Sequence, residues 1–223
     1  MERSAGEVPV AARTAMSDAT QSAFIHNFVP GKLASTILVL HGQGGDENDL
    51  LPVARALAPG AAFLSPRGKA LENGAARFFA RVSPDVFDVA EVRSRTAELA
   101  DWVTAAVVQY RLDATKVFAL GFSNGASIAA STMLLHPGIL AGGLLLRPRT
   151  IFEPENLPDL SGAPVLVIAG QRDDKMPEGA SEHLARLLGR AGAAVDMAMI
   201  DADHGLTPQD FSVGKNWLAK ILS

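Results

Sequence analysis

Residues 116–130 read KVFALGFSNGASIAA, and this stretch decides the expected fold. It opens with an apolar run, residues 117–120, that is typical of a buried strand. It closes with small and apolar residues up to 135, which are typical of a helix packed closely on a sheet. Between them lies Gly-x-Ser-x-Gly, in which the serine occupies a sharp strand-to-helix turn with its hydroxyl raised above the sheet. Ser123 is therefore a candidate nucleophile.

The pentapeptide alone is weak evidence, because short motifs occur by chance in a chain with 20 glycines. The alternative interpretation is an ordinary glycine-rich turn. The strand before the motif and the helix after it favour a nucleophile, since the mechanism requires both. The free N–H groups and positive end of that helix would also face any anion formed at Ser123.

The length of 223 residues suits one domain with a full core. We expect residues 1–20, rich in Ala, Ser and Thr, to be a flexible tail, and residues 21–223 to form that domain. Hydrophobic residues make up 48% and charged residues 20%, as in ordinary globular proteins. Absence of cysteine excludes disulfides, thiol chemistry and cysteine-ligated metal.

Charge and hydropathy exclude several classes of partner. The net charge of −4 and the scattered basic residues argue against nucleic-acid binding. No apolar stretch approaches the length of a bilayer span. The amino terminus lacks the apolar core of a signal peptide, which predicts a cytoplasmic location.

Strands and helices are expected to alternate along the chain. The expected strands are residues 22–29, 35–40, 61–65, 117–120, 141–146, 163–169 and 193–200. The expected helices are residues 46–58, 89–110, 126–135, 178–191 and 207–222. Several strands are apolar on both faces, so we predict an α/β fold with a mostly parallel sheet covered by helices on both faces. Ligands then gather beyond the carboxyl ends of the strands.

A serine nucleophile needs a base within hydrogen-bond reach and a carboxylate to hold that base. Of five histidines, His204 directly follows the last strand and is the best candidate. His41 lies near the site but ends a strand, where shaping the loop is the better interpretation. Asp173 and Asp174 both follow a strand between those of Ser123 and His204, giving the order Ser, Asp, His.

Acyl transfer also needs donors for an oxyanion. The backbone N–H of Asn124, directly after the serine, is one candidate. The second is Gln43 in the segment HGQGG at 41–45. A phosphate loop is the alternative for this segment, but the lysine and the spacing of a P-loop are missing.

With these residues assembled, the chain resembles the phospholipase/carboxylesterase family of α/β-hydrolases, which includes bacterial carboxylesterases and acyl-protein thioesterases. The matching motifs are LHGQGGD (40–46), SPRG (65–68), GFSNGA (121–126), GQRDDKMP (170–177) and DHGL (203–206). The resemblance is closer to small hydrolases of the hydroquinone and dienelactone type, in RFFAR (77–81), VFD (86–88) and LLRP (145–148). It covers nearly everything from residue 35 onward.

The resemblance implies a triad of Ser123, Asp173 and His204, and it selects Asp173 over Asp174 by its spacing from the motif's glycine and proline. It implies oxyanion donors at Gln43 and Asn124. It also implies an α/β-hydrolase fold without a large lid, and a reaction with no cofactor and no metal.

The expected function is hydrolysis of small, short-chain carboxylic esters through an acyl-enzyme. Thioesterase and dienelactone- or lysophospholipid-type hydrolysis are the alternatives, and a non-catalytic binding protein is a weaker one. Candidates to line the substrate site are Phe78, Phe79, Phe152 and Met176. Arg149, with Arg67, Arg77 and Arg81, is a candidate for binding a substrate carboxylate. The expected partner is a small ester, and a homodimer is left open.

Overall fold

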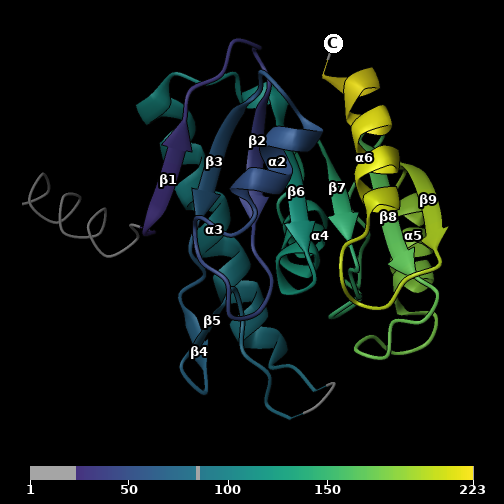
Figure 1. Ribbon diagram of the computed structural model, residues 1–223. Coiled ribbons are helices and arrows are strands. Elements are labelled where there is room, and N and C mark those ends of the chain that lie inside the picture. The colour runs from purple at the N-terminus through teal and green to yellow at the C-terminus, as the bar shows by residue number, and fades with distance from the viewer. Residues whose placement is uncertain (1–23, 84–85, 223) are drawn as a thin grey trace, which may run out of the picture.

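The computed structural model describes residues 24–83 and 86–222, so the predicted tail at 1–20 lies outside the described residues. A seven-stranded sheet forms the centre, in the order β1-β3-β2-β6-β7-β8-β9 (Figure 1). Its strands are β1 (His26–Val29), β2 (Thr36–Leu40), β3 (Ala62–Pro66), β6 (Val117–Phe122), β7 (Gly142–Leu146), β8 (Pro164–Gly170) and β9 (Ala194–Ile200). All neighbouring strands are parallel except β1, which pairs antiparallel with β3.

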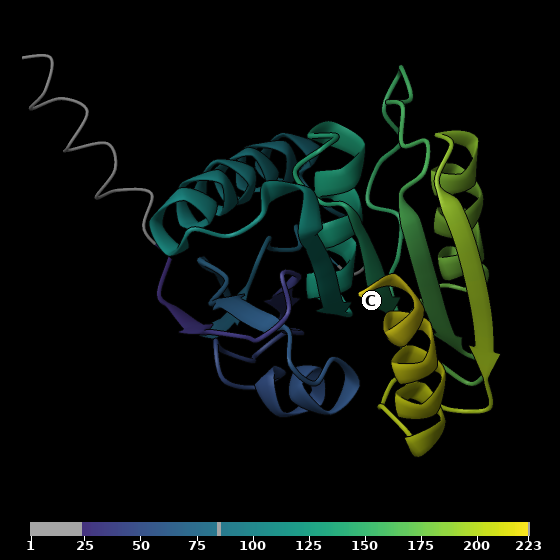
Figure 2. The ribbon, with the colours of Figure 1, turned by 90° about the horizontal axis from the view of Figure 1, so that it is seen from above.

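Helices cover both faces of this sheet, as predicted. They are α2 (Leu51–Leu57), α3 (Val89–Tyr110), α4 (Asn124–Leu135), α5 (Ala180–Arg190) and α6 (Pro208–Ile221). Seen from above, α3, α4 and α5 lie on one face, and α2 and α6 lie on the other (Figure 2). Each face has its own apolar core, and β2 and β7 are buried along their whole length. Apolar side chains on both faces of a strand require this double cover.

Two predicted boundaries differ from the structure by more than two residues. The helix expected at 46–58 begins only at Leu51, because the Asp46 carboxylate accepts the Asn48 N–H at 2.7 Å and closes a turn before the helix. The strand expected from residue 22 begins at His26.

The segment after β3, for which neither a strand nor a helix was expected, is not wholly irregular, so that expectation is wrong. It contains a hairpin of β4 (Ala70–Glu72) and β5 (Ala75–Arg77). Asn73 and Gly74 form its turn with φ of 52° and 80°. Two consecutive residues with positive φ are typical of the tight hairpin turn that Asn-Gly favours.

The sheet places five loops together. The loops after β2, β6, β7, β8 and β9 all leave from the carboxyl ends of neighbouring parallel strands. That edge is where an open α/β sheet forms its ligand site. No helix in the described ranges is long and apolar enough to cross a membrane.

Candidate active site

Ser123 occupies the tight turn between β6 and α4. Its backbone has φ 54° and ψ −111°, a strained conformation for a residue with a side chain. The chain can turn here because the flanking glycines approach other backbone atoms closely. A Cβ on Gly121 would lie 2.6 Å from the Ala126 nitrogen, and one on Gly125 would lie 2.1 Å from the Leu40 carbonyl oxygen. The Gly-x-Ser-x-Gly pattern is therefore a packing requirement.

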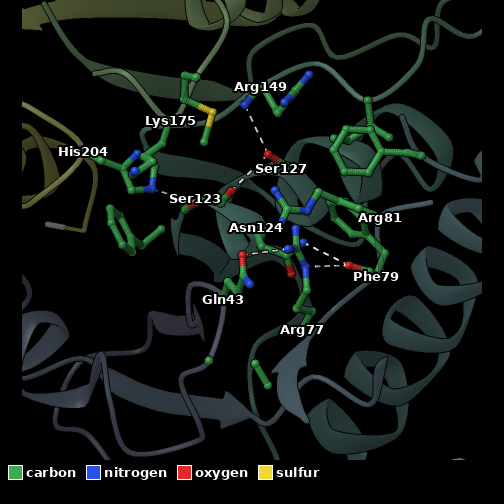
Figure 3. Close-up of a pocket in the computed structure, with 16 residues that line it drawn as sticks. Gln43, Arg77, Phe79, Arg81, Ser123, Asn124, Ser127, Arg149, Lys175 and His204 are labelled. Carbon is green, nitrogen blue, oxygen red and sulfur yellow. Dashed lines mark hydrogen bonds between the residues drawn. The ribbon is translucent and has the colours of Figure 1, made fainter. Parts of the chain in front are cut away.

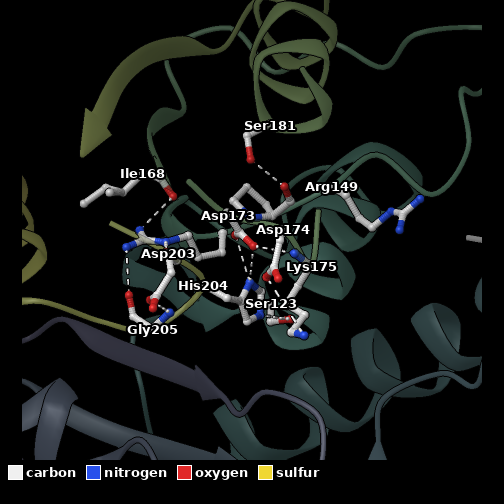
Figure 4. Close-up of polar contacts among 12 residues, drawn as sticks. Ser123, Arg149, Ile168, Asp173, Asp174, Lys175, Ser181, Asp203, His204 and Gly205 are labelled. Carbon is white, nitrogen blue, oxygen red and sulfur yellow. Dashed lines mark hydrogen bonds and ion pairs between the residues drawn. The ribbon is translucent and has the colours of Figure 1, made fainter. Parts of the chain in front are cut away.

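A chain of hydrogen bonds joins the three predicted catalytic side chains (Figure 4). Nε2 of His204 lies 3.0 Å from Oγ of Ser123, and Nδ1 lies 2.8 Å and 3.0 Å from the two carboxylate oxygens of Asp173. An Nδ1–H donated to the carboxylate leaves Nε2 as the acceptor for the serine hydroxyl. These contacts favour the tautomer that a general base requires.

Burial separates the two candidate aspartates. The Asp173 side chain is 5% exposed and bonds to the imidazole. The Asp174 side chain is 78% exposed and lies near Lys175. The structure thus brings Asp173 to His204 and turns Asp174 toward solvent.

Hydrogen bonds anchor the side chains of Gln43 and Asn124 to residues 77–79, at the end of β5 and directly after it. Figure 3 shows the contacts to Arg77 and Phe79. Arg77 Nη1 donates to Gln43 Oε1 at 2.8 Å. Asn124 Oδ1 accepts the Phe78 N–H at 2.7 Å, and its Nδ2 donates to the Phe79 carbonyl at 3.3 Å. These contacts fix both side chains, and the two residues line the same pocket as Ser123.

His41 shapes the loop after β2, as predicted. Its side chain is buried, with Nδ1 bonded to the Gly42 carbonyl at 2.6 Å and Nε2 accepting the Gly68 N–H at 2.9 Å. Burial lowers the pKa of His41, an effect that outweighs its hydrogen bond to Gly42 and the nearby Asp49 carboxylate. The ring is thus kept neutral as a fixed link between two loops.

A cavity of about 480 Å³ opens over Ser123 and His204. Among the predicted substrate contacts, Phe79, Met176 and Arg149 line it (Figure 3). Phe78 lies outside it with its ring against His41, and Phe152 lies outside it with its ring beneath the Arg93 guanidinium.

The cavity also contains residues that the sequence analysis missed or left as general candidates. Phe87, Phe122 and Ser127 add apolar and hydroxyl surface. Four of its lining residues are cations (Arg77, Arg81, Arg149 and Lys175), and no described Asp or Glu lines it. Glu72, just outside, forms ion pairs with Arg77 and Arg81. Ala75 and Arg77 of the β4–β5 hairpin line the cavity, and the Asn-Gly turn at 73–74 was the sequence signal that could have predicted this hairpin.

No group of three or more His, Cys, Asp or Glu side chains suited to a metal occurs among the described residues. The site instead joins a hydroxyl, an imidazole and a carboxylate at the carboxyl edge of a mostly parallel sheet covered by helices on both faces. This arrangement defines an α/β-hydrolase.

Comparisons with known proteins define the class further. The chain is 38% identical over 197 residues to "Putative hydrolase MhqD" of Bacillus subtilis (strain 168), covering 88% of this chain and 98% of that protein. The Bacillus cereus carboxylesterase structure is 36% identical with a TM-score of 0.87, covering 92% of this chain and 98% of that one. The chain therefore belongs to the carboxylesterase family of α/β-hydrolases.

A second similar structure is that of YahD with malic acid, at 26% identity and a TM-score of 0.82. It covers 87% of this chain and 97% of YahD. No protein-family model matches the chain.

Proposed function

We propose that the protein is a serine carboxylesterase that hydrolyses small, short-chain carboxylic esters through an acyl-enzyme on Ser123. The observation that carries this proposal is the pair of contacts at His204. Nε2 lies 3.0 Å from the Ser123 hydroxyl and Nδ1 lies 2.8 Å from Asp173, at the base of an open cavity. These are the distances at which a base can activate a hydroxyl.

In the first half-reaction, Oγ of Ser123 bonds to the ester carbonyl carbon while its proton passes to Nε2 of His204. Asp173 stabilises the imidazolium, and the N–H groups of Gln43 and Asn124 bind the oxyanion. The intermediate then collapses, the C–O bond to the alcohol breaks, and His204 returns the proton to the departing oxygen.

In the second half-reaction, water attacks the acyl-enzyme as His204 accepts one of its protons. Collapse of the second intermediate releases the carboxylic acid and returns the proton to Ser123. These steps balance without a cofactor, since water supplies both the hydroxyl and the hydrogen of the products.

Ser123→Ala tests the proposal. We expect turnover of p-nitrophenyl acetate and butyrate to fall by about 10⁶-fold, the scale seen when a triad serine is removed. The variant should keep its fold, because the substitution removes only the hydroxyl of Ser123, and the helix that follows begins with small residues. A folded variant with near-normal hydrolysis would reject the proposal.

Thioester and lactone substrates are the alternatives on the same residues. Acyl-CoA and dienelactone substrates, compared with p-nitrophenyl esters of increasing chain length, would rank these activities. A purely binding role predicts no covalent labelling by a fluorophosphonate, a reagent that reacts with activated serines.

We also propose that esters bearing a carboxylate are preferred. The cations that line the cavity favour an anionic substrate, and YahD, a similar protein, was solved with the dicarboxylic malic acid. Hydrolysis of a monoester of a dicarboxylic acid should exceed that of its neutral methyl diester in kcat/KM. Arg149→Gln should reduce that preference by raising KM for the acidic ester alone. Equal kcat/KM values of the wild-type protein for the acidic monoester and the neutral diester would contradict this preference.

A further inference from the structure

Arg147 is a buried cation that ester hydrolysis does not itself require. It follows β7, adopts a positive φ of 52°, and its side chain is 0% exposed. Its partner Asp210 is 2% exposed. Taking two charges out of water carries a large desolvation penalty, so a buried pair survives where its hydrogen bonds are well satisfied.

The guanidinium of Arg147 has five N–H groups, and the contacts provide five acceptors. Asp210 accepts two of them, from Nη1 at 2.7 Å and from Nη2 at 3.0 Å. The other three acceptors are main-chain carbonyls: Asp203 at 3.2 Å from Nε, Gly205 at 3.0 Å from Nη2 and Ile168 at 3.5 Å from Nη1. The contacts from the guanidinium to Ile168 and Gly205 are drawn as dashed lines in Figure 4.

Two of these carbonyls belong to the residues on either side of His204. Arg147 therefore holds the carbonyl groups of both residues that flank the proposed base. Asp210 fixes the same loop from the other side, because its Oδ2 also accepts from the N–H of Thr207 at 2.7 Å and from its hydroxyl at 2.9 Å. The loop that carries His204 is thus fixed to the start of α6 and to Arg147.

The nucleophile is fixed to the same place. The Ser123 N–H donates to the carbonyl of Leu146 at 2.8 Å, and the Arg147 N–H donates to the carbonyl of Ile168 in β8 at 2.8 Å. Two consecutive residues, Leu146 and Arg147, therefore connect the serine turn with the histidine loop. A displacement of about 1 Å between reacting groups can cost about 10²-fold in rate.

We propose that Arg147, held by Asp210, is a positioning residue that sets the imidazole of His204 against the hydroxyl of Ser123. This inference rests on the proposed serine esterase function. Arg147 touches no substrate and acts through the backbone around His204. Its loss should therefore lower kcat and leave KM nearly unchanged.

Arg147→Lys separates positioning from charge, because lysine keeps the positive charge beside Asp210 but has three donors in place of a planar fork of five. We expect kcat for p-nitrophenyl butyrate to fall by about 10- to 100-fold, with KM within about twofold. The rate of fluorophosphonate labelling at Ser123 should fall by a similar factor.

The matched control is Arg172→Lys. Arg172 also donates to a main-chain carbonyl of this region, that of Asp201 at 3.2 Å, but its side chain is 61% exposed. Its kcat and labelling rate should stay unchanged.

If Arg147→Lys does not fold, Asp210→Asn is the second test. Asparagine keeps the shape of the carboxylate, but its neutral amide binds the Arg147 guanidinium more weakly. We expect kcat and the labelling rate to fall for this variant too, but only several-fold, at constant KM. Folded variants that react at the wild-type rate would overturn the proposal. That result differs from failure of the esterase proposal, in which wild-type Ser123 itself would not be labelled.

Discussion

At the scale of single residues, environment decides which of two identical groups takes part in the site. Asp173 and Asp174 are neighbours in sequence, yet the first is buried against His204 and the second is largely in solvent. The loop after β8 makes this choice, because the Asp173 carboxylate also accepts the Lys175 N–H at 3.0 Å and is held in the turn. The proposed roles of the two aspartates therefore differ completely.

Asp173→Asn should lower kcat by about 10⁴-fold, because an amide in place of the carboxylate no longer holds the imidazole in the required tautomer. Asp174→Asn is the matched control and should keep wild-type kcat. Steady-state hydrolysis of p-nitrophenyl butyrate measures both. Equal effects of the two substitutions would show that Asp173 does not assist His204.

His41 predicts a pH-dependent stability. Burial lowers its pKa in the folded state below the ordinary value of about 6.5, so the unfolded chain binds more protons once the pH falls below that value. The contribution of His41 to the free energy of unfolding is therefore fully present above about pH 6.5 and is lost as the pH falls through the folded-state pKa. Urea titrations of wild-type and His41→Asn proteins at several pH values would measure it. The advantage of the wild type should shrink from pH 7.5 to pH 5, and a constant difference would contradict this explanation.

At the scale of elements, the turn between β6 and α4 depends on close backbone packing. Strand and helix can meet at Ser123 because Gly125 lies directly against the carbonyl of Leu40 in β2. The same contact brings the start of α4 close to the loop that contains Gln43. The glycines thus join the nucleophile turn to the proposed oxyanion loop.

Gly125→Ala should destabilise the protein by about 1–3 kcal/mol and reduce its activity, because the new methyl group would overlap backbone that cannot move freely. Gly189→Ala is the control. Gly189 lies in α5, where an added Cβ meets nothing within 4 Å, so alanine should stabilise the helix by about 0.5–1 kcal/mol. Denaturant unfolding compares the two variants, and equal stability changes would contradict the packing argument.

At the scale of the whole molecule, the order of the strands of the main sheet and of the helices was predictable, because short apolar runs mark the buried strands and turn residues separate them from the helices. Ser123, Asp173 and His204 could be singled out since each follows a strand whose carboxyl end reaches one edge of the sheet. The structure confirms the α/β fold and brings these three side chains together.

Other features depended on contacts between distant segments. Adjacent side chains of an extended segment point to opposite sides, so the sequence alone could not show that Phe79 faces the cavity and Phe78 packs against His41. Arg147 lies 56 or more residues from the carbonyls it holds beside His204, and no local pattern reveals that contact. The hairpin of β4 and β5 was not predicted, although its Asn-Gly turn is present in the sequence.

The central claim is that folding delivers an activated hydroxyl at Ser123. The most direct measurement is mass spectrometry of the wild-type protein after reaction with a fluorophosphonate, followed by peptide mapping, with Ser123→Ala and His204→Ala treated in parallel. We predict a single adduct on Ser123 in the wild type, no adduct in Ser123→Ala, and much slower labelling in His204→Ala. Labelling on another residue, or labelling that persists in Ser123→Ala, would contradict the claim.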